Sequence, residues 1–188
     1  HNLGNKMIKL IRFIYIFLIL LIFTEENQAA RIITTNAKQA LLIDFDTNRI
    51  LLQRNAEMPM DPASMSKLMT IYLAFEALEQ KRIKLDTELI VSKKAWLKKD
   101  KKGNFLPPSG SSMFLEPETR VKFEDLLRGI IVQSGNDACI VVAESLSGSE
   151  EQFVEEMNSK SKELGLTQSN FVNSTGWPHE NHFLSPLD

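Results

Sequence analysis

The chain has 188 residues, of which 43% are hydrophobic and 24% are charged, and its formal net charge is −2. This length is enough for one domain with a hydrophobic core, or for a large part of a bigger domain. The near-neutral balance, and the lack of any stripe of basic and aromatic residues, argue against a protein that binds nucleic acid. No internal repeat or low-complexity tract is visible.

Residues 1–30 have the pattern of an upstream extension followed by a signal peptide. Lys6, Lys9 and Arg12 precede an apolar run over residues 13–23. That run is short for a membrane span but has the right length for the core of a secretory signal, and a pair of alanines follows it. The alternative is an uncleaved membrane anchor. Both interpretations predict that the remainder, residues 31–188, is exported.

A hairpin and a long helix come next in the chain. Residues 40–45 and 49–53 are predicted to be two β-strands, and they are joined by a cluster of turn-forming residues. Asp61 can cap a helix whose first position is Pro62, where the missing N–H of proline costs nothing. The sequence therefore predicts a central helix over residues 62–80. Its body is apolar on almost every face, which predicts burial on all sides.

The following segment mixes a short strand with charged and loop-forming stretches. Residues 88–92 are a strand candidate. A basic run over residues 98–102 lies close to Trp96, and such a run could contact an anionic polymer or a membrane surface. Runs of this kind are usually solvated, and we favour that interpretation. Residues 105–112 contain Pro-Pro-Ser-Gly and are expected to form a loop.

Residues 122–165 are predicted to form a helical subdomain. Apolar residues recur at helical spacing over residues 122–133, and two more helices are expected over about 138–146 and 153–164. A glycine shortly after each of the last two supplies a helix stop. Cys139, the single cysteine, has no partner for an internal disulfide and is expected to be a small core residue.

Two polar side chains stand out at the start of the central helix. Ser64 and Lys67 are three residues apart and project from the same face of the first turn. A serine hydroxyl becomes a good nucleophile when a base takes its proton, and lysine is a base only when it is neutral. Burial and the positive end of the helix dipole both lower its pKa. Ser64 is therefore the predicted nucleophile and Lys67 its general base. The spacing alone is weak, because Ser159 and Lys162 repeat it in a polar segment interpreted as a solvated helix face.

A second motif, Ser-Gly-Asn, begins at Ser134 in the turn between two predicted helices. A hydroxyl placed near Lys67 can relay a proton to a leaving amine, and Asn136 can hold an amide carbonyl of the substrate. Helix capping by Asn136 is the competing interpretation. Each motif is weak by itself. The two together, in this order and about 70 residues apart, indicate acyl transfer.

On these motifs the sequence resembles the low-molecular-mass penicillin-binding proteins, and in particular their D-alanyl-D-alanine carboxypeptidases. The S-x-x-K signature at Ser64 is shared with the β-lactamases, and the S-G-N form of the middle motif resembles the carboxypeptidase branch. The resemblance covers most of the chain from Ala37 onward. Besides the hairpin, it rests on residues 62–67, 127–143, 163–166, 173–178 and 181–183.

The resemblance implies an α+β fold of the β-lactamase/transpeptidase-like type, in which an antiparallel sheet is flanked by helices and a helical subdomain carries the middle motif. It implies a serine peptidase that removes the terminal D-alanine from peptidoglycan stem peptides and is acylated by β-lactam antibiotics. In that mechanism Ser64 forms the acyl-enzyme, Lys67 is the base, Ser134 relays a proton and Asn136 binds substrate. No cofactor or metal is implied. The expected location is the periplasm or the outer face of the bacterial cytoplasmic membrane, with possible association with the membrane surface.

One departure from the family pattern is plain. The third motif, K-T-G or K-S-G on a sheet strand, occurs nowhere in these residues. We interpret this as truncation of a longer catalytic domain, so that the 188 residues alone are expected to be inactive. The alternative is a non-catalytic exported protein that binds the cell wall.

Two further alternatives are less well supported. A class A β-lactamase needs a carboxylate in an E-x-x-L-N stretch, and here Glu163 is followed by Leu166 but by Thr167 in place of asparagine. The simpler interpretation is that Glu163 lies in the last turn of a helix. A metal hydrolase would use His179 and His182, but a proline precedes them and no third ligand is evident, so we interpret them as surface turn residues.

Overall fold

The structure is a computed structural model that describes residues 33–96, 98–99, 105–106 and 110–188. The chain divides into two units, His1–Thr35 and Asn36–Asp188, and every helix and strand that is described lies in the second unit. The signal peptide predicted for residues 1–30 and most of the basic run at 98–102 lie outside the described residues. Among the helices that are described, none combines the length and the apolar character needed to cross a membrane.

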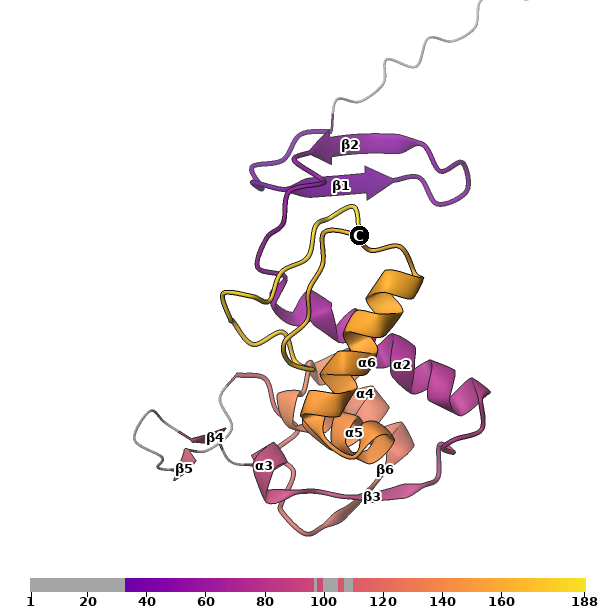
Figure 1. Ribbon diagram of the computed structural model, residues 1–188, viewed down its shortest axis with the longest axis vertical. Coiled ribbons are helices and arrows are strands. Elements are labelled where there is room, and N and C mark those ends of the chain that lie inside the picture. The colour runs from indigo at the N-terminus through magenta and orange to yellow at the C-terminus, as the bar shows by residue number, and fades with distance from the viewer. Residues whose placement is uncertain (1–32, 97, 100–104, 107–109) are drawn as a thin grey trace, which may run out of the picture. The chain divides into compact units, whose positions relative to one another are not determined.

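The strands pair as three two-stranded antiparallel sheets (Figure 1). The hairpin is formed as expected, with Ala40 opposite Arg54 and Leu42 opposite Leu52. The sheets are β1 (Ala40–Ile43) with β2 (Ile50–Arg54), β3 (Glu88–Ile90) with β6 (Arg120–Lys122), and β4 (Lys98–Lys99) with β5 (Phe105–Leu106).

Three of these strands differ from the sequence prediction, and one of them is β4, which lies in the segment interpreted as a solvated basic run. The sequence predicts no strand at β6 and begins a helix at its last residue, Lys122, because a three-residue strand is too short to show an alternating pattern. The strand β5 lies in a segment predicted to be a loop, and its two residues are held by pairing with β4 rather than by their own propensity.

The helices follow the predicted order with shifted ends. The long helix expected over 62–80 is observed as a 3-10 turn, η1 (Ala63–Ser66), followed by α2 (Lys67–Glu79). A four-residue helix, α3 (Lys93–Trp96), follows β3. The later helices are α4 (Phe123–Gln133), α5 (Asn136–Ser147) and α6 (Glu150–Glu163). The last begins three residues earlier than predicted, because Ser149 caps it by accepting a hydrogen bond from the amide of Gln152 at 3.2 Å.

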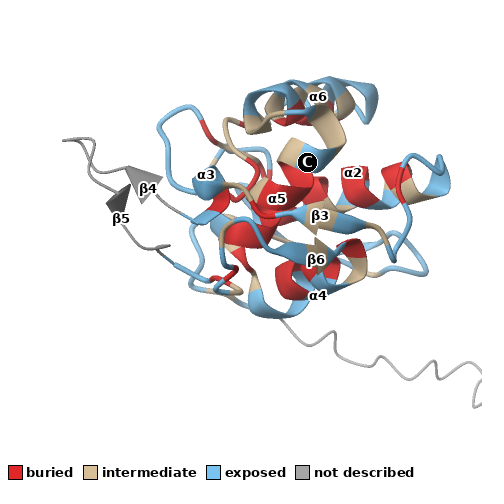
Figure 2. Ribbon diagram, turned by 90° about the horizontal axis from the view of Figure 1, so that it is seen from below, coloured by how far each residue is buried: buried red, intermediate tan, exposed pale blue. Residues whose placement is uncertain are grey.

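The core is built around α5. This helix contacts α2, α3, α4 and α6, and Figure 2 shows buried residues concentrated on it and on the neighbouring faces of α2 and α4. Cys139 is fully buried there, as predicted for a small core residue. The main cluster of buried residues joins α2, α4 and α5, and its fully buried members include Ala74, Ala77, Phe123, Leu126, Ala138, Val141 and Val142.

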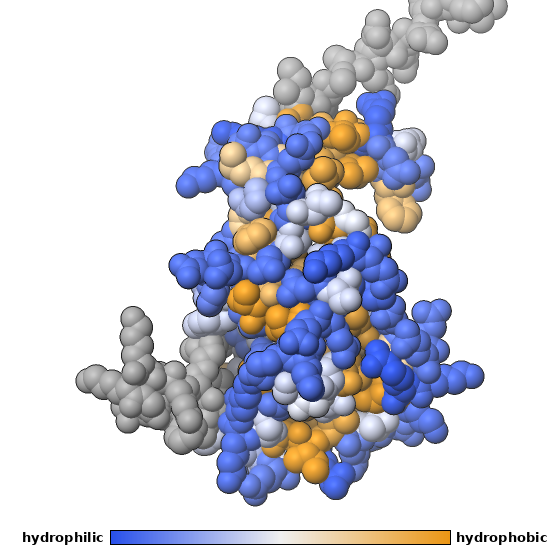
Figure 3. Space-filling view, viewed as in Figure 1, coloured by the Kyte–Doolittle hydropathy of each residue, from blue (hydrophilic) through white to orange (hydrophobic). Residues whose placement is uncertain are grey.

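The prediction that the central helix is buried on all sides is wrong. One face of α2 packs on the core, but Leu68 is 71% exposed and Phe75 is 51% exposed, and no described segment covers them. An apolar composition shows that a face can be buried but does not show which neighbour covers it. Hydrophobic side chains are also exposed on the β1–β2 hairpin (Figure 3), among them Ile43, Phe45 and Ile50.

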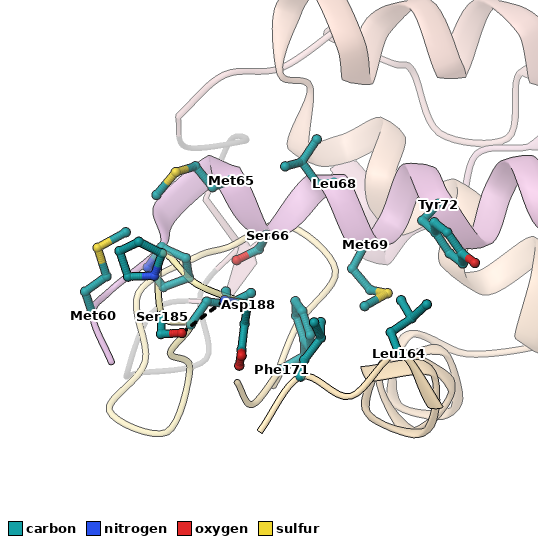
Figure 4. A pocket seen from close by; sticks show the side chains of 14 residues that line it. Met60, Met65, Ser66, Leu68, Met69, Tyr72, Leu164, Phe171, Ser185 and Asp188 are labelled. Carbon is teal, nitrogen blue, oxygen red and sulfur yellow. Dashed lines mark hydrogen bonds between the residues drawn. The ribbon is translucent and has the colours of Figure 1, made fainter. Parts of the chain in front are cut away.

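An apolar groove of about 310 Å³ runs beside α2 (Figure 4). Met69 and Tyr72 from α2 face Leu164 and Phe171 across it. None of the four predicted site residues lines this groove, so it is distinct from the site that they form.

A buried carboxylate fixes the segment that precedes β6 against the start of α5. Asp137 is 1% exposed. Its Oδ1 accepts the amide of Met113 at 2.9 Å, and its Oδ2 accepts the Ser112 hydroxyl at 2.7 Å and the amide of Leu115 at 3.0 Å. One side chain therefore satisfies donors of a loop that would otherwise be buried without partners.

We expect Asp137→Ala to lower the free energy of unfolding by about 3–5 kcal/mol, because several buried donors lose their acceptor at once. Urea unfolding of the purified protein measures this change. The matched control is Glu124→Ala, which removes an exposed pair with Arg128 and should cost no more than ~0.5 kcal/mol. Equal losses in the two variants would contradict the anchoring role of Asp137.

Candidate active site

The segment that carries Ser64 leaves the preceding chain through a tight turn. Asp61 Oδ1 accepts the amide of Ala63 at 3.0 Å, so the predicted capping residue does bond into the start of the helix. Ala63 has a φ of +46°, a left-handed conformation that is uncommon for a residue with a side chain. The 3-10 turn then leaves Ser64 exposed while Lys67 begins α2. The Nζ of Lys67 lies 3.2 Å from Ser64 Oγ.

Lys67 is only 4% exposed. Burial lowers the pKa of its ammonium group from the ordinary value of 10.5, because the charged form loses its hydration. Cys139 lies close enough that a thiolate there would oppose this shift. Burial raises the pKa of that thiol to about 12, however, so at neutral pH it is uncharged and supplies no counter-charge to Lys67.

Ser134 ends α4 in a left-handed conformation with φ 57° and ψ 36°. Its amide donates to Ile130 O at 3.1 Å, and the next amide, that of Gly135, donates to Gly129 O at 3.0 Å, so the turn is closed by backbone bonds. A left-handed residue other than glycine costs of order 1 kcal/mol or more and is often associated with a functional site. Here it places Ser134 Oγ 3.1 Å from Ser64 Oγ.

Asn136, the first residue of α5, lies two residues after Ser134. Its amide donates to Ser111 O at 2.8 Å, and its side-chain nitrogen faces Gly110, where an added Cβ would stand 3.0 Å from it. The structure thus brings Ser64 within hydrogen-bonding distance of both Lys67 and Ser134, and it places Asn136 on the same turn as Ser134.

A fifth component was not identified from the sequence. Lys67 Nζ donates to the backbone carbonyl of Thr175 at 2.7 Å, across 108 positions of the chain. Thr175 belongs to a loop that Asn173 organises by accepting from the amides of Thr175, Gly176 and Trp177 at 2.8–3.1 Å. A backbone carbonyl has no sequence signature, but the Asn-x-x-Gly pattern of the loop was a signal for an asparagine-centred turn.

A buried histidine supports the same region. The prediction that His182 is a surface turn residue is wrong, because this side chain is only 3% exposed. Its Nε2 lies 2.7 Å from the Oγ of Ser66, which stands between Ser64 and Lys67 in the chain. The amide of Val172 donates to its Nδ1 at 3.4 Å, so the ring has Nε2 as its donor to Ser66. Within the described residues no group of three His, Cys, Asp or Glu side chains could hold a metal ion.

Two of the competing features identified in the sequence lie away from this site. Glu163 is 68% exposed at its side chain and pairs with Lys160 at 2.7 Å, which fits the last turn of a helix rather than a water-activating carboxylate. In the second S-x-x-K copy, Ser159 and Lys162 are both exposed on α6, as predicted for a solvated helix face.

An exposed serine hydroxyl within hydrogen-bonding distance of a buried lysine amine and of a second hydroxyl is the arrangement of nucleophile and base that serine–lysine enzymes use. Comparison with known protein families identifies one family. The family model described as D-alanyl-D-alanine carboxypeptidase matches residues 24–188, and the chain belongs to this family.

Individual relatives agree with this assignment. The chain is 41% identical over 152 residues to D-alanyl-D-alanine carboxypeptidase DacF of Bacillus subtilis, covering 81% of this chain and 36% of that protein. It is 38% identical over 155 residues to DacC of Escherichia coli, covering 82% and 38%. The structure resembles penicillin binding protein 5 from Haemophilus influenzae with a TM-score of 0.74 at 34% identity, covering 82% of this chain and 43% of that one. The predicted α+β fold of the transpeptidase-like type is confirmed. The chain spans little more than a third of the curated relatives.

The loop that carries Thr175 approaches the Ser64 segment at a glycine. Gly176 has a φ of +77°, and a Cβ added there would lie 1.8 Å from the carbonyl oxygen of Ala63. We expect Gly176→Ala to lower the free energy of unfolding by about 3 kcal/mol or more, because backbone on both sides must move. Gly165→Ala is the control: its φ is +79°, but no atom lies within 4 Å, so only about 1 kcal/mol should be lost. Chemical denaturation of both variants makes the comparison, and equal losses would refute the close approach.

Proposed function

We propose that the intact protein is a serine D-alanyl-D-alanine carboxypeptidase that trims the terminal D-alanine from peptidoglycan stem peptides. The observation that carries the proposal is the position of Ser64 Oγ, which lies 3.2 Å from Lys67 Nζ and 3.1 Å from Ser134 Oγ. Membership of the family and the names of the relatives support the choice of substrate. Because the chain covers about a third of those relatives, the proposal concerns the intact protein.

In the acylation step, the neutral amine of Lys67 takes the proton of the Ser64 hydroxyl as Oγ attacks the carbonyl of the penultimate D-alanine. Burial without a counter-charge favours the neutral amine that this step needs. When the tetrahedral intermediate collapses, the C–N bond breaks and the departing D-alanine takes a proton. That proton passes from Lys67 through the hydroxyl of Ser134, and the acyl group stays on Ser64 as an ester.

In the second step, water attacks the ester and the C–O bond to Ser64 breaks, which returns the serine hydroxyl and releases the shortened peptide. Asn136 is proposed to hold the amide carbonyl of the acyl chain through both steps. A β-lactam presents a strained amide to the same serine, so acylation by β-lactams belongs to the proposal. The similarity to a penicillin binding protein from Haemophilus influenzae supports this part of it.

Export is also part of the proposal. Stem peptides of peptidoglycan lie outside the cytoplasm, and the basic residues and apolar run over residues 1–23 have the pattern of a secretory signal. The proposed location is the periplasm or the outer face of the cytoplasmic membrane. Cell fractionation of the producing bacterium tests it, and recovery of the protein in the cytoplasm would overturn it.

We expect Ser64→Ala to abolish covalent labelling of the intact protein by a fluorescent penicillin, because the ester cannot form without the hydroxyl. Ser159→Ala, in the exposed second copy of the motif, is the matched control and should label like the wild type. Labelling is measured by gel fluorescence and by the intact mass of the adduct. A Ser64→Ala protein that still forms the adduct would refute the assignment of the nucleophile.

The rate of acylation should depend on pH through Lys67. Because the pKa of Lys67 is lowered from 10.5 and the base must be neutral, the rate constant should rise about tenfold per pH unit and level off before pH 10.5. Lys67→Arg should be inactive at every pH, since a guanidinium group stays charged. Stopped-flow acylation by a fluorescent penicillin between pH 6 and 10 measures the profile. A flat profile over this range would exclude Lys67 as the titrating base.

A further inference from the structure

The Lys67 amine donates a hydrogen bond to a backbone carbonyl. The position of that carbonyl depends on the contacts that hold the surrounding loop. Thr175 O lies 2.7 Å from Lys67 Nζ. Asn173 shapes the loop from within but does not tie it to the rest of the protein. The ties to other elements are made by the preceding residue, Ser174, which is completely buried.

Ser174 is bonded on every polar atom. Its amide and its hydroxyl both donate to Glu150 Oε1, at 3.1 and 2.8 Å, and its carbonyl accepts the hydroxyl of Thr70 at 2.7 Å. Thr70 lies in α2, one turn after Lys67. The peptide unit that leads into Thr175 is therefore fixed between the helix that carries the base and the carboxylate of Glu150.

The start of a helix and a neighbouring lysine surround the side chain of Glu150. It is the first residue of α6, where the positive end of the helix dipole favours a negative charge. Its side chain is 15% exposed, and its Oε2 lies 3.6 Å from Lys94 Nζ of α3. Hydrogen bonds that donate to a carboxylate are stronger than those between neutral groups, so Glu150 is a firm anchor for Ser174.

The neighbouring carboxylate shows that this contact is not a general property of the helix start. Glu151 pairs with the same lysine, Lys94, at 2.7 Å, but its side chain is 74% exposed. Glu151 accepts a hydrogen bond from Lys94. Glu150 accepts, in addition to its pairing with Lys94, hydrogen bonds from the amide and the hydroxyl of Ser174. The two glutamates share their helix and their cation and differ in the contact with the loop.

We propose that Glu150 is a positioning residue for the acyl transfer, acting through Ser174 on the carbonyl of Thr175. A neutral lysine amine has two N–H bonds and one lone pair. When one N–H bonds Thr175 O, rotation about the Cε–Nζ bond is restricted and the lone pair is directed at Ser64 Oγ. Displacement of the carbonyl removes this restriction. This inference rests on the proposed function, because it assigns Glu150 a part in the same reaction.

The proposal also predicts the direction of a pH effect. A carbonyl at 2.7 Å favours the charged ammonium form of Lys67. If the carbonyl moves away, the pKa of Lys67 falls further. Loss of Glu150 should then lower the plateau rate of acylation and move the midpoint of the pH profile toward lower pH. A variant that is only less stable would contain fewer active molecules but would keep the midpoint of the wild type.

The test compares Glu150→Ala, Glu150→Gln and Glu151→Ala in the intact protein, with acylation by a fluorescent penicillin followed from pH 6 to 10. The amount of acyl-enzyme formed counts the folded, active molecules in each sample. Misplacement of a catalytic group by about 1 Å can cost about 100-fold in rate, so Glu150→Ala should lower the plateau by roughly 10- to 100-fold. Its midpoint should shift to lower pH.

The two other variants separate the loop contact from the ion pair. Glutamine keeps an oxygen for the two donors of Ser174, so Glu150→Gln should recover most of the plateau and the midpoint of the wild type. Glu151→Ala should match the wild type within about twofold, as expected for an exposed ion pair. A Glu150→Ala profile that coincides with that of Glu151→Ala would overturn the inference.

The outcomes also separate this inference from the proposed function. Absence of acylation of Ser64 in the wild type would refute the function itself. If Glu150→Ala does not fold, Ser174→Ala carries the test, because it removes the hydroxyl bond to Glu150 and keeps the amide bond. Its plateau should lie below that of the wild type, with a midpoint at lower pH, and a profile equal to that of the wild type would overturn the inference.

Discussion

The structure buries the amine of Lys67 between Ser64 Oγ and Thr175 O. An ammonium group in such a place loses its hydration and gains no counter-charge, because the thiol of Cys139 behind it is neutral at neutral pH. The fold stabilises this unfavourable group by packing α2 against α5 on one side and the loop of Thr175 on the other. The same desolvation that costs stability lowers the pKa of the base.

Three connecting segments, those of Ser64, Ser134 and Thr175, meet at the site. Different interactions fix the conformation of each segment. The turn of Ser64 uses a side-chain cap and a left-handed alanine. Ser134 uses a left-handed helix end, and the buried carboxylate of Asp137 holds the neighbouring loop to the same helix start. The loop of Thr175 uses an asparagine-centred turn and a glycine without room for a side chain. Rigid helices position these connections, and the connections carry the reactive groups.

The sequence predicted what depends on local spacing. The pairing of Ser64 with Lys67 follows from one helical turn, and the half-buried position of Ser134 follows from its place between two helices. It did not predict what depends on distant neighbours. The carbonyl of Thr175 is a group that every residue has, so no residue type marks it. The exposure of Leu68 was missed because apolar composition does not reveal which faces find a partner, and β6 was missed because its stability comes from pairing with β3.

The separations of the contacting groups along the chain have a consequence for timing. Ser64 and its base are three positions apart, whereas Ser134 follows 70 positions after the serine and Thr175 follows 108 positions after the lysine. While a ribosome is still completing the chain, the hydroxyl is present but its amine is hydrated, charged and unable to accept a proton. In the mechanism proposed above, Ser64 therefore becomes reactive only after the loop of Thr175 has docked on Lys67, and the serine of a nascent polypeptide is inert.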